Sequence, residues 1–133
     1  MSDCLVTTID KVLGLPEREG PRLSFPEGAT TARAIVEARV RVEVERYNAG
    51  EEAPVRGALF APGPAESTLN DPRRERRVPL DVEPQIDRAV DAVRAGRVIV
   101  LFNGSQVDDI DRPLAMTPVS EARFIRLVAL VGG

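Results

Sequence analysis

The sequence predicts an α+β domain, and three observations favour it. Strand-like segments rich in β-branched residues open and close the chain, two segments with helical spacing lie between them, and no βαβ repeat runs through this order. At 133 residues the chain has the length of one domain, so we expect residues 1–133 to fold as a single unit. A chain of this size buries roughly two-thirds of its unfolded surface, which is enough for one core.

The N-terminal segments are typical of a β-hairpin. Residues 4–14 are rich in β-branched side chains and end at a glycine, which predicts the first strand. A turn with proline and glycine follows, and then the short segment RLSF, in which Leu23 and Phe25 share one face. We therefore expect these two segments to pair.

Residues 30–50 predict a helix, although part of the segment also alternates like a strand. Thr30 or Thr31 is a good N-cap, and apolar residues follow helical spacing up to the stop signals Asn48 and Gly50. Valines at alternate positions from 40 to 44 would also fit a strand. The cap, the length and the stop signals agree with one another, which favours the helix.

Residues 49–80 interrupt this pattern. Five prolines and few periodic apolar residues predict a flexible insertion within the domain. The run PRRERR inside it could contact phosphates, but a solvated loop is the better interpretation in a chain of net charge −3.

Regular structure is predicted again after residue 80. A second helix begins near Asp81 or Glu83, ends at Gly96 and presents one apolar face, formed by Ile86, Ala89, Val90 and Val93. The apolar run Val98–Phe102 predicts a strand buried on both faces. Asn-Gly at 103–104 is typical of a hairpin turn, and residues 122–130 predict the last strand.

Composition excludes several classes of protein. The chain contains no histidine, which removes Ser–His and Cys–His nucleophiles and the common zinc sites, so we expect neither an enzyme nor a metal site. Its one cysteine, Cys4, forms no internal disulfide, is expected to be inert, and is too few for a ferredoxin cluster, which needs four. Asp108, Asp109 and Asp111 are interpreted as a solvated bend rather than a cation site.

Charge and hydropathy bear on partners and location. A net charge of −3 argues against a nucleic-acid binder, which usually carries a basic excess. The N-terminus lacks a signal-like segment, and the longest apolar run is too short to span a bilayer. We therefore expect a cytoplasmic protein that binds neither nucleic acid nor membrane.

The last third of the chain has a series of features in a fixed order: an apolar strand, an Asn-Gly turn, a short strand, a Pro-Leu bend, a last strand and a Gly-Gly end. They are Val98–Phe102, Asn103-Gly104, Val107, Asp111 with Pro113-Leu114, residues 124–128, and Gly132-Gly133. In this order the segment resembles the C-terminal half of the small sulfur carriers of the MoaD and ThiS families. The N-terminal half is similar only in the order of its elements.

This resemblance implies a β-grasp (ubiquitin-like) fold, in which a mixed sheet packs on a helix, here with an inserted loop and a second helix. The carriers are much shorter and lack the insertion at 49–80. The chain is in this respect more similar to larger ubiquitin-like proteins of bacterial operons, which occur beside E1-like and E2-like enzymes.

The function that the resemblance implies is protein modification. An E1-like enzyme would use ATP and magnesium to adenylate the Gly133 carboxylate, which would pass through a thioester, with an E2-like enzyme, to a target protein. One alternative is a sulfur carrier that forms a C-terminal thiocarboxylate. Another is a non-covalent β-grasp module that self-assembles and needs no glycine end. In all three cases the chain itself holds no cofactor.

The resemblance also implies where the functional residues lie. Gly132 and Gly133 would be the activated end, since glycine leaves the terminal carbonyl unhindered. Residues of the last strand would contact the partner enzyme; the set is Arg126, Val128, Leu130 and Val131. Arg126 would face away from the helix as a contact residue, or it would be a surface arginine that lies over its apolar neighbours. Lys11, the only lysine, is the candidate acceptor for self-conjugation.

Overall fold

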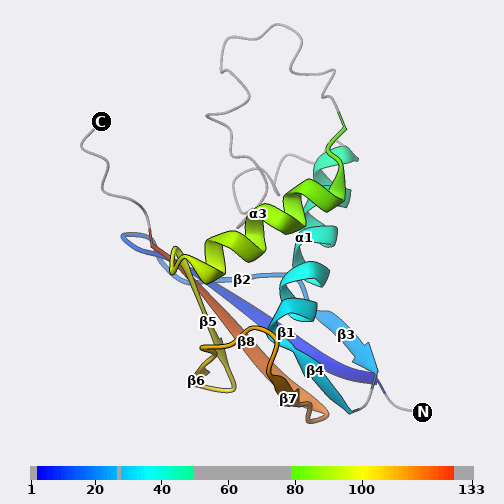
Figure 1. Cartoon of the computed structure of the whole chain (residues 1–133), viewed down its shortest axis with the longest axis vertical. Helices are drawn as coiled ribbons and strands as arrows, with labels where there is room; N and C mark the ends of the chain where they lie inside the picture. Colours follow the sequence, from blue (N-terminus) through cyan, green and yellow to red (C-terminus); the bar gives the residue numbers. More distant parts are fainter. Residues whose placement is uncertain (1–2, 27, 50–78, 128–133) are drawn as a thin grey trace, which may run out of the picture.

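The computed structural model describes residues 3–26, 28–49 and 79–127. Its elements are β1 (Asp3–Val12), β2 (Arg18–Glu19), β3 (Leu23–Pro26), β4 (Ala29–Thr31), α1 (Ala32–Asn48), α3 (Val82–Arg94), β5 (Val98–Phe102), β6 (Ser105–Gln106), β7 (Pro113–Ala115) and β8 (Val119–Arg126). Both helices lie on one side of a mixed sheet (Figure 1). The predicted α+β class is confirmed.

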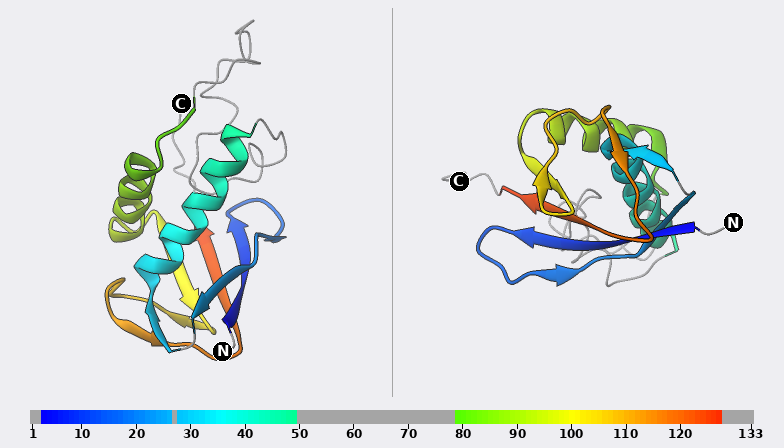
Figure 2. Two further views of the ribbon diagram at one scale, coloured as in Figure 1. Left: turned by 90° about the vertical axis from the view of Figure 1, so that its right-hand side faces the viewer. Right: turned by 90° about the horizontal axis from the view of Figure 1, so that it is seen from below.

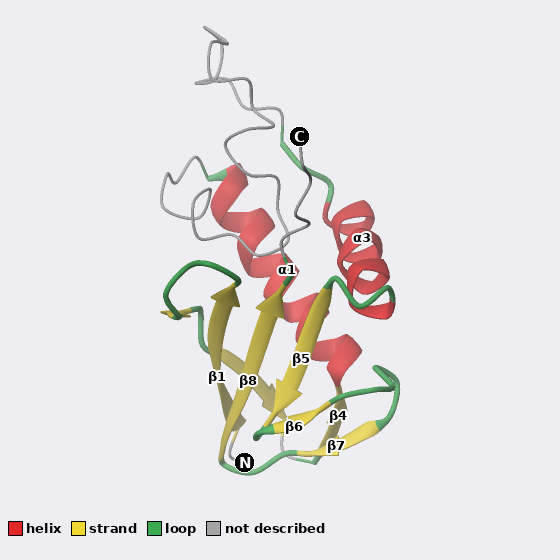
Figure 3. Cartoon of the chain, turned by 90° about the vertical axis from the view of Figure 1, so that its left-hand side faces the viewer, coloured by secondary structure: helices red, strands yellow, loops and turns green. Residues whose placement is uncertain are grey.

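The main sheet has the strand order β2-β1-β8-β5-β6, and β3 pairs with β1 on the same side as β2. β1 and β8 are parallel neighbours, whereas β5 runs antiparallel to β8 (Figure 3). A separate small sheet joins β4 to β7. The last strand of the described chain therefore lies in the centre of the sheet, between β1 and β5.

The predicted N-terminal hairpin is confirmed. β1 and β3 are antiparallel, with Cys4 opposite Phe25 and Val6 opposite Leu23. The chain between them adds β2, a two-residue strand that the turn signals did not predict. The turn after β1 contains Gly14, whose φ of 88° favours glycine.

α1 forms where the sequence allowed either a helix or a strand. The Thr31 hydroxyl accepts a hydrogen bond from the backbone N–H of Ala34 at 3.1 Å, which caps the first turn. Val36, Val40 and Val44 are buried at intervals of four, so helical periodicity, not alternation, matches the core.

The second predicted helix is α3, and its start is tied to the end of α1. The Asn48 side chain accepts from the Leu80 N–H at 2.7 Å and donates to the Leu80 carbonyl at 3.1 Å. This pair of bonds joins the two chain ends that flank residues 50–78. Most of the predicted insertion at 49–80 lies outside the described residues.

The β5–β6 hairpin follows the prediction at its turn. Asn103 and Gly104 have φ values of 48° and 87°, as a two-residue turn of this kind requires. The predicted start of the last strand was wrong. β8 begins at Val119, three residues earlier than expected, and the expected residues 128–130 lie outside the described chain.

The prediction that β5 is buried on both faces is also wrong. Val98, Val100 and Phe102 are buried, whereas Ile99 and Leu101 between them are only half-buried. The helices cover one face of the sheet, as the two views of Figure 2 show. A continuous apolar run in the sequence does not by itself show whether one face of a strand is buried or both.

The two faces of the sheet differ in what they contact. The helix face holds the core residues of β1, β5 and β8 and packs on α1 and α3. On the opposite side, the open face carries half-buried apolar side chains, namely Leu5, Ile9, Ile99, Leu101 and Ile125. Among the described residues, we find no helix with the length and hydropathy needed to cross a bilayer.

Candidate functional site

The predicted functional end of the chain follows β8 in the sequence. Gly132, Gly133 and the predicted contact residues Val128, Leu130 and Val131 lie outside the described residues. The chain is described up to Leu127, whose N–H donates to the Arg97 carbonyl at 2.9 Å.

The residue before Leu127 is held from the other side. The Arg126 carbonyl accepts from the Leu13 N–H at 3.2 Å. Backbone bonds to β1 and to the start of β5 thus position the end of β8.

Exposed apolar side chains surround this point. Among the described residues, Leu13, Leu15 and Leu127 are 51%, 55% and 37% exposed. Leu13 is hydrogen-bonded to the end of β8, and Leu15 is held by its N–H bond to the Val12 carbonyl in the same turn. We call these three leucines the exit patch. Several exposed leucines near one another indicate a contact surface more strongly than a single one does, because large apolar patches mark contact surfaces.

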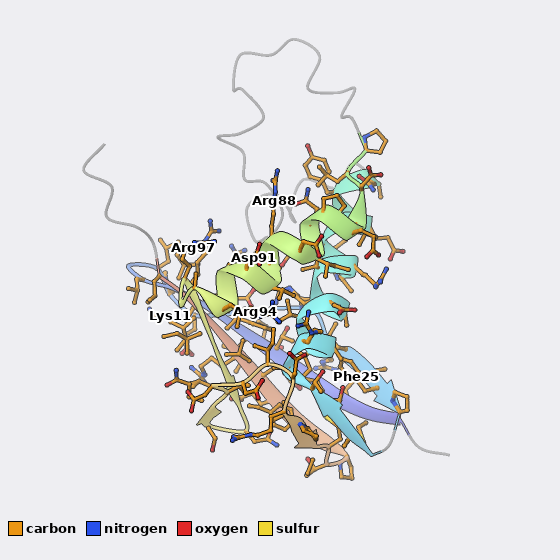
Figure 4. The ribbon with its side chains drawn as sticks, in the orientation of Figure 1. Lys11, Phe25, Arg88, Asp91, Arg94 and Arg97 are labelled. Carbon is orange, nitrogen blue, oxygen red and sulfur yellow. The ribbon has the colours of Figure 1, made fainter. Side chains whose placement is uncertain are left out.

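Basic residues lie beside the exit patch. Figure 4 shows Lys11 and Arg97 close to the end of β8, whereas Arg88 and Asp91 project from α3. The Lys11 Nζ donates to the Leu15 carbonyl at 2.5 Å. The surface around the end of β8 is therefore apolar with a positive border.

The expected orientation of Arg126 is wrong. Burial alternates along β8, with Ala122 and Phe124 buried on the helix face. Arg126 has the same parity as Phe124, so it lies on the helix side of the sheet, at the exposed end of the strand.

Arg123 is the arginine of β8 that lies on the open face. It pairs there with Glu17 and, at 3.7 Å, with Glu121. The parity of β8 could be assigned only once the buried Phe124 was known.

A buried charged cluster, which sequence reasoning missed, joins α1 to β1. Arg39 is 1% exposed, and its guanidinium donates to both carboxylate oxygens of Asp10 at 2.8 and 2.5 Å. Its Nε donates to Glu43 at 2.8 Å, one helical turn away. The guanidinium also lies 5.6 Å from the centre of the Phe124 ring.

The electrostatics of this cluster favour a permanently charged Arg39. Burial by itself disfavours the charge, but the hydrogen bond to Asp10 and the charges of Glu43 and Asp10 outweigh burial and raise the pKa of Arg39 above its usual value. The cluster has the chemistry of a structural ion pair and offers no reactive group.

The aspartate bend is also structural. Arg33 donates to both oxygens of Asp111 at 2.6 and 3.2 Å, and Arg94 lies 3.6 Å from the same carboxylate. The hydrogen bond from Arg33 lowers the pKa of Asp111, helped by the positive charges of Arg33 and Arg94 and opposed by partial desolvation. An open hollow of about 220 Å³ lies beside the bend.

In the part of the chain that the structure describes, the residues form neither a metal site nor an exposed thiol. No group of three or more potential metal ligands occurs among these residues. Cys4 is a free thiol, 3% exposed, in β1. A buried thiol of this kind packs as a small apolar side chain.

Comparisons with protein-family models, with curated proteins and with solved structures found no match to this chain. The functional assignment therefore rests on the sequence resemblance and on the geometry at the end of β8.

Proposed function

We propose that the chain is a ubiquitin-like protein modifier with a β-grasp fold. In this proposal an E1-like enzyme adenylates the Gly133 carboxylate with ATP and magnesium, and the acyl group passes through a thioester to a target. The observation that carries the proposal is the parallel pairing of β1 with β8 in the centre of the sheet.

The strand order supports the β-grasp assignment. β1 pairs with the second half of its own hairpin on one side and with the last strand on the other, and the next strand, β5, pairs with β8. α1 follows the hairpin and packs across the sheet. A hairpin, then a helix, then further strands is the order that the resemblance implies.

The end of β8 supports the role of the two glycines. Leu127 is held at the border of a rigid sheet, and residues 128–133 can extend about 20 Å from it. A tail of that reach can deliver a carboxylate into an enzyme while the sheet stays outside. Glycine at the last two positions leaves the carbonyl open from both sides, because it has no Cβ.

The exit patch supports contact with a partner during this step. Leu13, Leu15 and Leu127 expose apolar surface where the tail begins, and Lys11 and Arg97 border it. An enzyme that receives the tail would cover these leucines at the same time, and an acidic border on that enzyme would complement the two cations.

Two alternatives share this geometry. A sulfur carrier would use the same tail to form a thiocarboxylate. A non-covalent module is favoured by one observation of its own, the open face with its half-buried Leu5, Ile9 and Ile125. Such a module would keep its activity after removal of Gly132 and Gly133.

Mass spectrometry of the protein recovered from its native host, with the neighbouring genes expressed, separates the three. A peptide branched through Gly133 onto a target lysine supports the modifier. Exchange of one carboxylate oxygen for sulfur supports the carrier and contradicts the modifier. A free carboxylate under every condition contradicts both and leaves the module.

A further inference from the structure

The turn between β5 and β6 consists of an asparagine and the glycine that follows it. Asn103 and Gly104 are both exposed, with φ values of 48° and 87°. A Cβ built on Gly104 would have no atom within 4 Å apart from its chain neighbours, so the space around this residue is open. The turn lies at the opposite end of the sheet from the exit patch (Figure 3).

Asn103 is bound to β8 by both its backbone and its side chain. The Asn103 Oδ1 accepts a hydrogen bond from the Glu121 N–H at 2.8 Å. The Asn103 N–H donates to the Glu121 carbonyl, also at 2.8 Å. These bonds extend the pairing of β5 with β8 by one residue beyond Phe102, which lies opposite Ala122. The asparagine amide is therefore exposed to solvent but held in one direction.

The two residues of the turn carry the groups for a reaction within the chain. The Asn103 side-chain carbon Cγ is an electrophile, and attack on it by the Gly104 peptide nitrogen closes a five-membered ring. Glycine has no Cβ that would obstruct this approach. Asparagine is also among the residues that are chemically labile in proteins. The turn thus combines a labile amide with an unhindered nucleophile.

We propose that Asn103 is a site of spontaneous covalent modification whose rate β8 restrains. The Gly104 nitrogen forms a bond to the Asn103 Cγ, the bond from Cγ to Nδ2 breaks, and ammonia leaves with the proton that the nitrogen loses. Water then opens the succinimide at either carbonyl, which gives aspartate or isoaspartate at position 103. Both steps need only water, so the inference does not rest on the proposed function.

The contacts with Glu121 slow the reaction in the folded protein. Ring closure requires the nitrogen and Cγ to come within about 3–3.5 Å with their orbitals aligned. The bond from the Glu121 N–H fixes the direction of the Asn103 amide, so the amide turns toward Gly104 only when that bond opens. The folded protein should therefore convert more slowly than the unfolded chain.

The two products differ in their effect on the sheet. Aspartate keeps the path of the backbone and an oxygen that can accept from the Glu121 N–H. In isoaspartate the chain continues through Cγ, the carbon whose oxygen is bound to Glu121. Gly104 then starts from a different point, and Ser105 loses its register with Phe102. Isoaspartate should therefore destabilise the protein more than aspartate does.

The test incubates the full chain at mildly alkaline pH, both folded and in urea above its unfolding midpoint. Peptide mapping by mass spectrometry should find loss of ammonia and then gain of water at Asn103, severalfold faster in urea. Asn48 is the internal control, because Ala49 follows it and carries a Cβ. Asn48 should convert much more slowly than Asn103 in both states.

A variant tests the ring closure, and a second one supplies a reference product. Gly104→Ala should slow conversion in urea by at least about tenfold, because its Cβ obstructs the nitrogen, and the unfolded state removes any effect on the turn. Asn103→Asp gives the aspartate form directly. Its melting temperature should exceed that of the isoaspartate form, which anion exchange separates from the unmodified protein.

Four results would overturn the inference. An intact Asn103 amide in the folded chain, after an incubation that converts the unfolded chain fully, would remove the site from the native protein. Equal rates in the two states would show that β8 imposes no restraint. An unchanged rate for Gly104→Ala in urea would contradict ring closure, and so would equal conversion of Asn48 and Asn103.

Discussion

Arg39 is a buried cation that two carboxylates surround. Taking three charges out of water is costly, and ion pairs of this kind often add little net stability over apolar packing. Removal of the cation alone is costly, because the buried carboxylates lose the positive charge that they pair with. Asp10 on β1 and Glu43 on α1 each pair with this guanidinium.

Arg39→Met should therefore lower the free energy of unfolding by about 3–5 kcal/mol, as measured by urea denaturation. Arg41→Met on the same helix is the matched control. Arg41 pairs with Glu83 at 3.5 Å on the surface, so its loss should cost less than about 1 kcal/mol. Similar losses for the two variants would contradict the role assigned to Arg39.

Gly20 is required for its lack of a side chain. A Cβ at this position would lie 2.5 Å from the Thr8 hydroxyl oxygen and 2.7 Å from the Arg39 Nη1. Gly20→Ala should destabilise the protein by about 1–3 kcal/mol, because the buried cluster must move to admit a methyl group. Thermal unfolding compared with Ser24→Ala, an exposed change in the neighbouring strand, would measure this; equal midpoints would be inconsistent with the crowding.

At the scale of elements, the bend at 107–112 is fastened to both helices. The Arg33 N–H donates to the Ile110 carbonyl at 2.9 Å, while the Arg33 and Arg94 side chains reach Asp111. The segment between β6 and β7 thus connects the start of α1 to the end of α3.

Asp111 should make stability depend on pH in the acid range. Its pKa is lowered in the folded protein, so its contribution is present above the pKa of about 3.9 of the unfolded chain and is lost as pH falls through the lower folded value. Asp111→Asn should be less stable than the unmodified chain at neutral pH, and the difference should shrink below about pH 4. Urea midpoints across this range test it.

The helices were predictable from sequence, and the short strands were not. Both helices have apolar residues at helical spacing and stop signals within their own segments, and α1 also has the side-chain N-cap Thr31. β2, β4 and β7 have two or three residues each, and they exist because of partners elsewhere in the chain. A pairing such as that of Thr30 with Leu114 cannot be recognised from the sequence around either residue.

The sequence also did not show which face of β1 is buried. Leu5 and Ile9 look like the core side of the strand, yet Val6, Thr8 and Asp10 are the residues that face the helices. The face of β1 that carries Thr8 and Asp10 can be buried because Arg39 neutralises Asp10 and the Pro21 carbonyl accepts a hydrogen bond from the Thr8 hydroxyl at 2.5 Å. At the candidate site, the two C-terminal glycines and Lys11 could be named from the sequence. The exit patch could not, because Leu13 and Leu15 are far from Leu127 along the chain and only the fold brings them near one another.

For the whole molecule, the fold and the proposed activity should be separable. Gly133→Val adds a β-branched side chain beyond the last described residue, so the melting temperature should not change. Activation by the E1-like enzyme should fall by about a hundredfold, because the carbonyl no longer fits where it must be attacked. Release of pyrophosphate measures activation, and Gly133→Ala should be affected less. Full activation of the valine variant would count against the proposal.

The position of β8 also determines when the protein can fold. Leu5 pairs with Val119, so the central parallel pair joins segments from near the two ends of the described chain. During synthesis, β1 has only its hairpin partner until residues 119–126 have left the ribosome. The apolar surface of β1, β5 and the two helices stays without its central strand for that time. Folding should therefore follow translation and be slow for its size, and the nascent chain should be a substrate for chaperones that bind exposed apolar segments.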